Sequence, residues 1–146
     1  MKIFIASDHA GLELKNKLKR FLKTQDRDIR DLGAFNYDKQ DDYPDYVEKL
    51  AKKLKKERQA KGILVCSSGV GVSLAANKFS YIRAVNACSK NIVISSRKDN
   101  NTNVICFGQK YVSFKKAKKI LQAWLKTDFS KQERHKRRLK KIENYE

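Results

Sequence analysis

The sequence places a thiol at the start of a loop of small residues. The apolar run "GILVC" ends at Cys66. The loop after it consists of Ser67, Ser68, Gly69, Val70 and Gly71. Small residues let backbone amides approach an anion closely, and the helix expected to follow would add its positive N-terminal end. The loop therefore suits a phosphate or a developing oxyanion. A buried core cysteine beside an ordinary strand-to-helix turn is the alternative that the loop leaves open.

Three kinds of thiol chemistry can be compared with this pattern. A tyrosine-phosphatase loop needs an arginine six residues after the cysteine, and Val72 stands there. A phosphocysteine carrier fits the string "CSSGVGVS" but leaves the polar groups elsewhere in the chain unexplained. A thiolate general base is the third possibility, because a helix N-terminus stabilises a thiolate and Ser68 could hydrogen-bond the sulfur. The loop alone leaves the carrier and the base open.

Further ionisable side chains lie next to other predicted strands. Asp8 and His9 follow the first predicted strand, and Lys110 follows the last one. The segment "SRKDNNTN", which leads into the last strand, contains Asp99 and Asn100. Polar groups thus gather near strand ends, where open parallel sheets form their sites.

Two arginines near the C-terminus could bind a phosphate. Arg134 and Arg138 are four residues apart in "RHKRR", so a helix there would present both guanidinium groups on one face. Two guanidinium groups on one face suit a phosphate monoester. A solvated basic helix is the competing interpretation.

The elements that must position these residues alternate regularly along the chain. Strands are predicted over residues 2–7, 28–33, 62–67, 82–88 and 103–108. Stretches with helical spacing of apolar residues lie between and after them, and the basic tail over about 130–145 can form one more helix. Short, nearly all-apolar strands separated by helices predict an α/β fold with a parallel sheet covered on both faces. A single domain is expected over residues 1–146.

The composition limits the classes of function. The chain has 34 Lys+Arg and 16 Asp+Glu, a formal charge of +18, which suggests a polyanionic partner. The lysines are spread over every predicted helix, so we interpret most of them as solvated helix faces rather than a nucleic-acid surface. Three cysteines without a close pair favour a reducing compartment. No apolar stretch approaches the ~20 residues of a membrane span, and a cytoplasmic protein is expected.

Taken together, these motifs resemble the type B ribose-5-phosphate isomerases, a family that also includes allose-6-phosphate and galactose-6-phosphate isomerases. The similarity runs from "IASDHAG" through "DYPDY" and the Cys66 loop to "NNTNVICFG" and "RHKRR". The resemblance implies a three-layer α/β/α, Rossmann-like subunit with a five-stranded parallel sheet. It also implies a homodimer, often doubled to a tetramer, whose active sites lie between subunits and use no metal or cofactor. The implied reaction interconverts ribose 5-phosphate and ribulose 5-phosphate, a step of the pentose phosphate pathway, through a cis-enediolate.

The resemblance also implies a role for each candidate residue. Cys66 matches the base, and the loop after it matches the anion hole, with Ser68 where many members have threonine. Asn100 matches a residue offered by the partner subunit, and the arginine pair matches the phosphate clamp. The expected catalytic residues are Cys66, Ser68, Asp99 and His9. The expected substrate-binding residues are Asp8, His9, Tyr43, Ser67, Ser68, Gly69, Val70, Gly71, Asn100, Lys110, Arg134 and Arg138.

Position 99 departs from the family pattern. The usual "R-x-H-N" reads "RKDN" here, so Asp99 stands where a histidine acid for ring opening is expected. A carboxyl kept protonated by its surroundings could still serve as the acid, or His9 could take over. The change could also mark another sugar, so allose 6-phosphate or galactose 6-phosphate is the alternative substrate. Outside this class, the alternatives are a phosphocysteine carrier and a basic nucleic-acid-binding protein.

Overall fold

The computed structural model describes residues 1–145, and its centre is one parallel sheet. The strands are β1 (Lys2–Ser7), β2 (Asp28–Asp31), β3 (Lys61–Cys66), β4 (Ala84–Asn86) and β5 (Val104–Gly108). They pair in the order β2-β1-β3-β5-β4, and every neighbouring pair is parallel. The predicted five-stranded parallel sheet is therefore confirmed.

Two strands are shorter than the sequence predicted. β2 ends at Asp31, although the next residues still run beside β1, since the N–H of Leu32 donates to the carbonyl of Ile5 at 2.9 Å. β4 spans only three residues. Ile82 belongs to the turn before β4, where its N–H donates to the carbonyl of Phe79.

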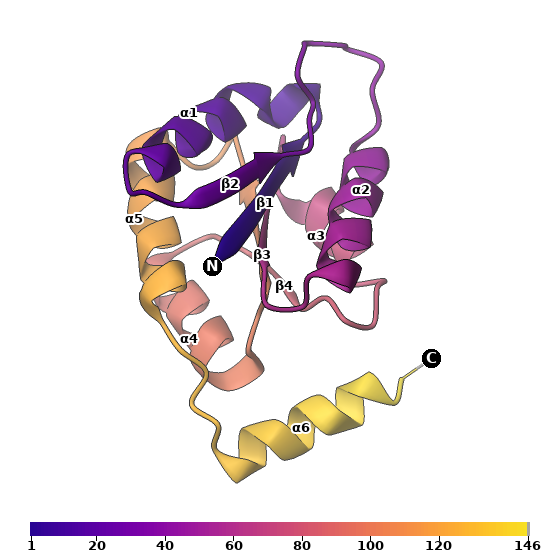
Figure 1. Ribbon diagram of the computed structural model, residues 1–146, viewed down its shortest axis with the longest axis vertical. Coiled ribbons are helices and arrows are strands. Elements are labelled where there is room, and N and C mark those ends of the chain that lie inside the picture. The colour runs from indigo at the N-terminus through magenta and orange to yellow at the C-terminus, as the bar shows by residue number, and fades with distance from the viewer. Residues whose placement is uncertain (146) are drawn as a thin grey trace.

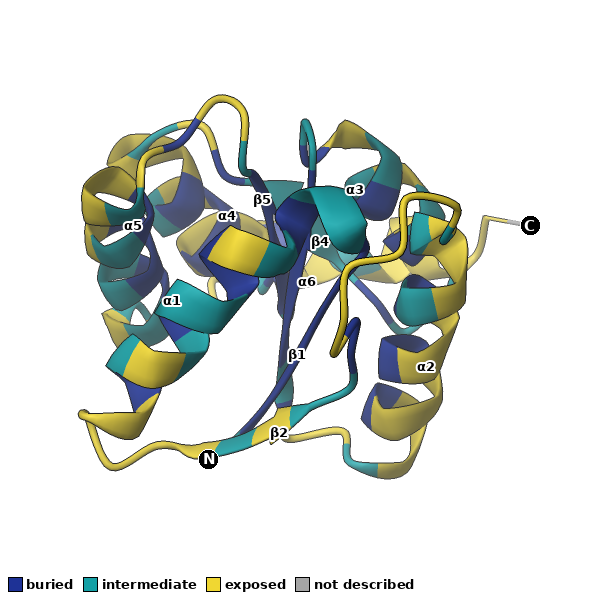
Figure 2. Ribbon diagram, turned by 90° about the horizontal axis from the view of Figure 1, so that it is seen from above, coloured by how far each residue is buried: buried dark blue, intermediate teal, exposed yellow. Residues whose placement is uncertain are grey.

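Helices cover both faces of the sheet. They are α1 (Leu12–Lys23), α2 (Tyr43–Lys56), α3 (Val70–Ala76), α4 (Lys90–Asn100), α5 (Phe114–Lys126) and α6 (Glu133–Glu143), with a 3-10 turn, η1, at His9–Gly11. Helices α1, α4 and α5 pack on one face, and α2 and α3 pack on the other (Figure 2). This arrangement confirms the three layers. Within the described part of the chain, none of the helices is long and apolar enough to cross a membrane.

The core lies on both sides of the central strands. Alternate residues of β3 enter the two apolar clusters, Ile63 on the α1/α5 side and Leu64 on the α2/α3 side. A strand buried on both faces reads as a continuous apolar run, which is why "GILVC" has no polar residue. Cys66 lies two residues after Leu64 on the same strand, so its thiol lies on the same side of the sheet, the α2/α3 side.

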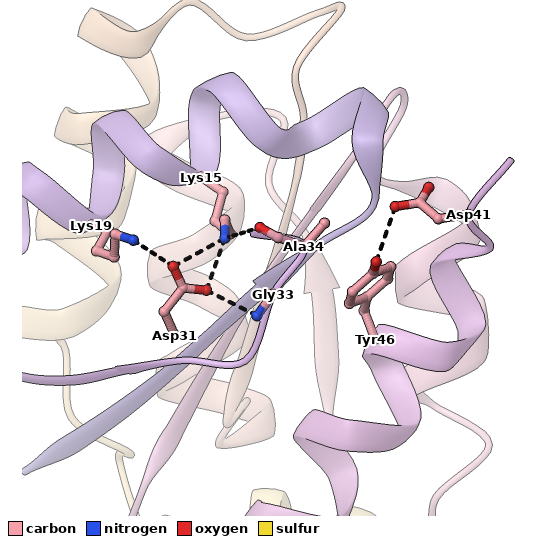
Figure 3. A network of polar contacts seen from close by, with 7 residues as sticks. All are labelled: Lys15, Lys19, Asp31, Gly33, Ala34, Asp41 and Tyr46. Carbon is pink, nitrogen blue, oxygen red and sulfur yellow. Dashed lines mark hydrogen bonds and ion pairs between the residues drawn. The ribbon is translucent and has the colours of Figure 1, made fainter. Parts of the chain in front are cut away.

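A buried lysine fixes the point where the chain leaves β2. The side chain of Lys15 is fully buried, and its Nζ donates to Oδ1 of Asp31 at 2.8 Å and to the carbonyl of Ala34 at 2.6 Å (Figure 3). Asp31 also accepts from Nζ of Lys19 and from the N–H of Gly33. Burial lowers the pKa of Lys15 despite the opposing effect of the Asp31 carboxylate. These contacts fix the direction in which the chain leaves β2 and enters the loop that leads to α2.

Replacing this lysine tests its contribution to stability. Lys15→Met leaves a buried carboxylate with one fewer cation and a carbonyl without its donor, so we expect a loss of about 3 kcal/mol in the free energy of unfolding. Lys19→Met removes a partly exposed amine from the same carboxylate and is expected to cost less than about 1 kcal/mol. Urea unfolding of both variants measures the difference. Equal losses would show that the burial of Lys15 does not matter.

Candidate active site

Cys66 lies where β3 ends and the loop to α3 begins. Its side chain is buried, with 4% of the residue exposed, and the N–H of Gly69 donates to Sγ at 3.1 Å. A backbone donor aimed at sulfur stabilises the thiolate form, the form that can accept a proton. Ser68 was expected to hydrogen-bond the sulfur. Its hydroxyl instead accepts from the N–H of Val70 at 3.2 Å, at the start of α3.

Two glycines shape the loop around the thiol. Gly69 has a φ of +79°, in the left-handed region, and a methyl group on it would lie 2.5 Å from Oδ1 of Asn86. A methyl group on Gly71 would lie 2.7 Å from Cζ of Tyr43. The ring of Tyr43 therefore packs directly against the Cys66 loop.

The turn after β1 lies beside the same loop. A methyl group on Gly11 would come within 2.5 Å of the Val65 carbonyl, so this turn is pressed against the end of β3. The carboxylate of Asp8 is nearly buried and accepts from the N–H of Gly11 at 3.0 Å. Burial raises the pKa of Asp8, and this hydrogen bond opposes the shift. Asp8 and His9 are thus close to the thiol loop, as the strand-end rule predicted.

His9 is held by a carboxylate that the sequence did not single out. Nδ1 of the ring lies 2.5 Å from Oδ1 of Asp41, and the N–H of His9 donates to the same oxygen at 3.1 Å. The hydrogen bond to Asp41 raises the pKa of His9, against a smaller opposing effect of burial. Asp41 comes from the loop before α2. Its only sequence signal is its position beside "DYPDY".

The ends of β5 and β4 complete this edge of the sheet. The N–H of Gln109 donates to the carbonyl of Cys66 at 2.9 Å, and the N–H of Lys110 donates to the carbonyl of Ser67 at 3.0 Å. Lys110 is exposed at the edge where it was expected. Asn86, the last residue of β4, touches the loop through its side chain and was missed. The predicted strand ran on to residue 88, so Asn86 lay inside it rather than at its end.

Three possible metal ligands lie together at this edge. One ligand atom from each of Asp8, His9 and Asp41 lies within 4.8 Å of the others. The hydrogen bonds already described use Nδ1 of His9 and one oxygen of each carboxylate. The observed contacts therefore account for this cluster without an ion.

The remaining candidates lie at the opposite edge of the same chain. Helix α4 returns the chain from the end of β4 to the start of β5, so Asp99 and Asn100 stand at the amino ends of the strands. Arg134 and Arg138 lie on α6, which runs below that edge in Figure 1 and packs against α4. A five-residue strand at ~3.3 Å per residue separates the two edges by roughly 15 Å. One chain therefore does not bring these four side chains to Cys66.

The surroundings of Asp99 are polar and open. Its side chain is 51% exposed, and Oδ1 lies 3.7 Å from Nδ1 of His135. The His135 ring is buried, with Ser130 Oγ at 2.8 Å from Nδ1 and Arg134 Nε donating to Nε2 at 3.2 Å. His135 therefore anchors the start of α6, and the Asp99 carboxyl beside it is half-exposed.

A buried thiol beside a glycine loop lies at the same edge of a parallel sheet as a histidine–carboxylate pair. Groups of these types, at a switch point of the strand order, are typical of α/β enzymes that use acid–base chemistry. The comparisons with known proteins agree. The model of the Ribose/Galactose Isomerase family matches residues 3–142. The chain belongs to this family.

Similar proteins span nearly the whole chain. The probable ribose-5-phosphate isomerase B of Mycoplasma genitalium is 41% identical over 145 residues, which cover 99% of this chain and 95% of that protein. The ribose-5-phosphate isomerase B of Escherichia coli is 36% identical, covering 97% and 93%. A crystal structure of the M. genitalium enzyme with bound ribulose-5-phosphate superposes with a TM-score of 0.94, covering 99% of this chain and 95% of that one.

Proposed function

We propose that this protein interconverts ribose 5-phosphate and ribulose 5-phosphate as a cofactor-independent isomerase of the pentose phosphate pathway. The observation that carries the proposal is the Cys66 thiol with the Gly69 N–H directed at its sulfur. The family membership and the named isomerases that match the whole chain support it. Three free thiols suit a reducing compartment, so we place the activity in the cytoplasm.

In the proposed reaction, Cys66 moves one proton between two carbons. The thiolate removes the proton from C2 of the open-chain aldose, the C1–C2 double bond forms, and negative charge develops on O1. After a proton passes from O2 to O1, the thiol returns its proton to C1, and the C2 carbonyl of the ketose forms. The loop Ser67–Gly71 lies where its backbone can face the enediolate oxygens. Asp8, His9, Tyr43 and Lys110 lie at the same edge and are proposed to bind the sugar.

A second copy of the chain is needed to complete this site. Asp99, Asn100 and the arginine pair lie at the far edge, so we propose that a partner subunit presents them to Cys66 across a two-fold axis. A homodimer repeats the same contact twice and therefore forms two shared sites. Pairing of dimers into a tetramer is compatible with this arrangement.

The surface around α6 supports such a partner. A groove of about 650 Å³ lies between α6 and the body of the subunit, and it is lined by Ile82, Leu139 and Ile142 among polar side chains. Ile142, which lines this groove, is 51% exposed. Apolar side chains left open in this way are typical of a surface that a protein partner covers.

The preferred substrate is identified by comparing turnover on three sugar phosphates. With one purified sample, kcat/KM is measured on ribose 5-phosphate, allose 6-phosphate and galactose 6-phosphate. We expect ribose 5-phosphate to give the highest value. A higher value on a six-carbon phosphate would instead connect Asp99 to the alternative substrate, and no turnover on any of the three would refute the proposed function.

The role of the thiol is tested by Cys66→Ser. Serine is a far weaker base at neutral pH, so we expect kcat to fall by about 10²–10⁴ while sugar-phosphate binding is largely kept. Cys88→Ser is the matched control, because it removes an exposed thiol. Full activity in Cys66→Ser would exclude the thiol as the base.

A further inference from the structure

The ring of His9 has one nitrogen committed and one available. Nδ1 pairs with Oδ1 of Asp41 at 2.5 Å, and that oxygen also accepts from the His9 N–H at 3.1 Å. Two bonds to one carboxylate fix both the backbone and the ring of the histidine. With Nδ1 paired to a carboxylate, the proton on that nitrogen is retained, and Nε2 is the nitrogen left for a ligand. Within residues 1–145, Nε2 makes no hydrogen bond.

Asp41 is itself held in place. Its side chain is 9% exposed, and the hydroxyl of Tyr46 on α2 donates to Oδ2 at 3.1 Å. Burial acts to raise the pKa of Asp41, but the bonds from His9 and Tyr46 outweigh it, and the pKa is lowered. The carboxylate therefore stays ionised and keeps a fixed direction toward the imidazole.

The electrostatic surroundings of His9 are acidic on several sides. Asp41 and Asp38 face it from the loop before α2, and Asp8 precedes it in the chain. Tyr37 packs edge-on against the ring, with centroids 5.5 Å apart. Of these three carboxylates, Asp41 alone hydrogen-bonds the ring, and this hydrogen bond is the largest cause of the raised pKa of His9.

We propose that Asp41 is the positioning residue that holds His9 as a cationic donor, with Nε2–H directed at an oxygen of the bound sugar phosphate. This inference rests on the proposed isomerase function for its role in turnover. The pairing of Asp41 with His9 is present in the protein without substrate. In ring opening, Nε2 would give its proton to the ring oxygen as the C1–O bond breaks, while the C1 hydroxyl loses its proton to water and becomes the aldehyde. As a phosphate ligand, the same N–H would donate without transferring the proton.

Asp41→Asn tests the pairing, because an amide keeps the size of the side chain but removes its charge. The chain has two histidines, so the ring signals of His9 and His135 can be followed by NMR titration and assigned with His9→Gln. We expect the pKa of His9 to fall in Asp41→Asn. Asp38→Asn is the matched control, since it removes the same charge from the same loop without touching the ring. The proposal fails if the pKa of His9 is unchanged in Asp41→Asn, or if Asp38→Asn lowers it equally.

Kinetics then connect the pairing to turnover. In Asp41→Asn, the limb of the pH–rate profile that reports loss of the His9 proton should move to lower pH. If the donor serves ring opening, kcat on ribose 5-phosphate falls at pH 8. If it serves the phosphate, KM rises and inhibition by inorganic phosphate weakens. An unchanged pH profile would overturn the role in turnover. An inactive wild-type protein would refute only the isomerase function, because the NMR titration would still decide the pairing.

The pH dependence of the free energy of unfolding tests the Asp41–His9 pair by a second route, in case Asp41→Asn disturbs the loop. The pKa of His9 is raised in the folded protein, so protonated His9 stabilises the fold below about pH 6.5. This stabilisation is lost as the pH rises through the raised pKa. The pKa of Asp41 is lowered in the folded protein, so ionised Asp41 stabilises the fold above about pH 4. This stabilisation is lost as the pH falls through the lowered pKa. Asp41→Asn should therefore lower the free energy of unfolding most between about pH 4 and pH 6.5. A loss that does not depend on pH would contradict an ionic pair. Tyr46→Phe, which removes only the bond from the tyrosine, should keep a raised pKa of His9.

Discussion

Every helix that joins two parallel strands must carry the chain from one edge of the sheet back to the other. This constraint sorts the polar residues of the protein into two groups. Residues that follow strands, such as His9 and Cys66, gather at the carboxyl edge, whereas residues that precede strands, such as Asn100, gather at the amino edge. The strand order changes direction between β1 and β3, and the thiol loop lies at this switch point. The proposed division of the site between two subunits rests on the same topology.

The carboxyl edge is organised by two ion pairs that hold the ends of one loop. Lys15 and Asp31 fix the loop where it leaves β2, and Asp41 fixes it to His9 shortly before α2 begins. Tyr43 follows directly and packs on the thiol loop through Gly71. Contacts between residues far apart in the sequence thus bring a histidine, a carboxylate and an aromatic ring to the edge of the sheet where the thiol lies.

The sequence was sufficient to predict the sheet, because its central strands are continuous apolar runs with helical patterns between them. It also placed Cys66, Asp8, His9 and Lys110 at one edge, since each follows a strand. It could not identify Asp41, because the partner of that carboxylate lies 32 residues away and depends on how the loop folds. Nor did it separate Asp99 from the Cys66 edge, although the position of "SRKDNNTN" before the last strand indicates the opposite edge.

In the proposed dimer, the thiol and the arginine pair work together only across two subunits. Co-expression of Cys66→Ser chains with Arg134→Ala/Arg138→Ala chains tests it directly, with turnover measured at a ribose 5-phosphate concentration well below KM. Each mixed dimer would contain one site with both the native thiol and the native arginines. Random pairing is then expected to restore about a quarter of wild-type activity from two nearly inactive parents. Activity no greater than that of the separate parents would show that each site is built within one chain.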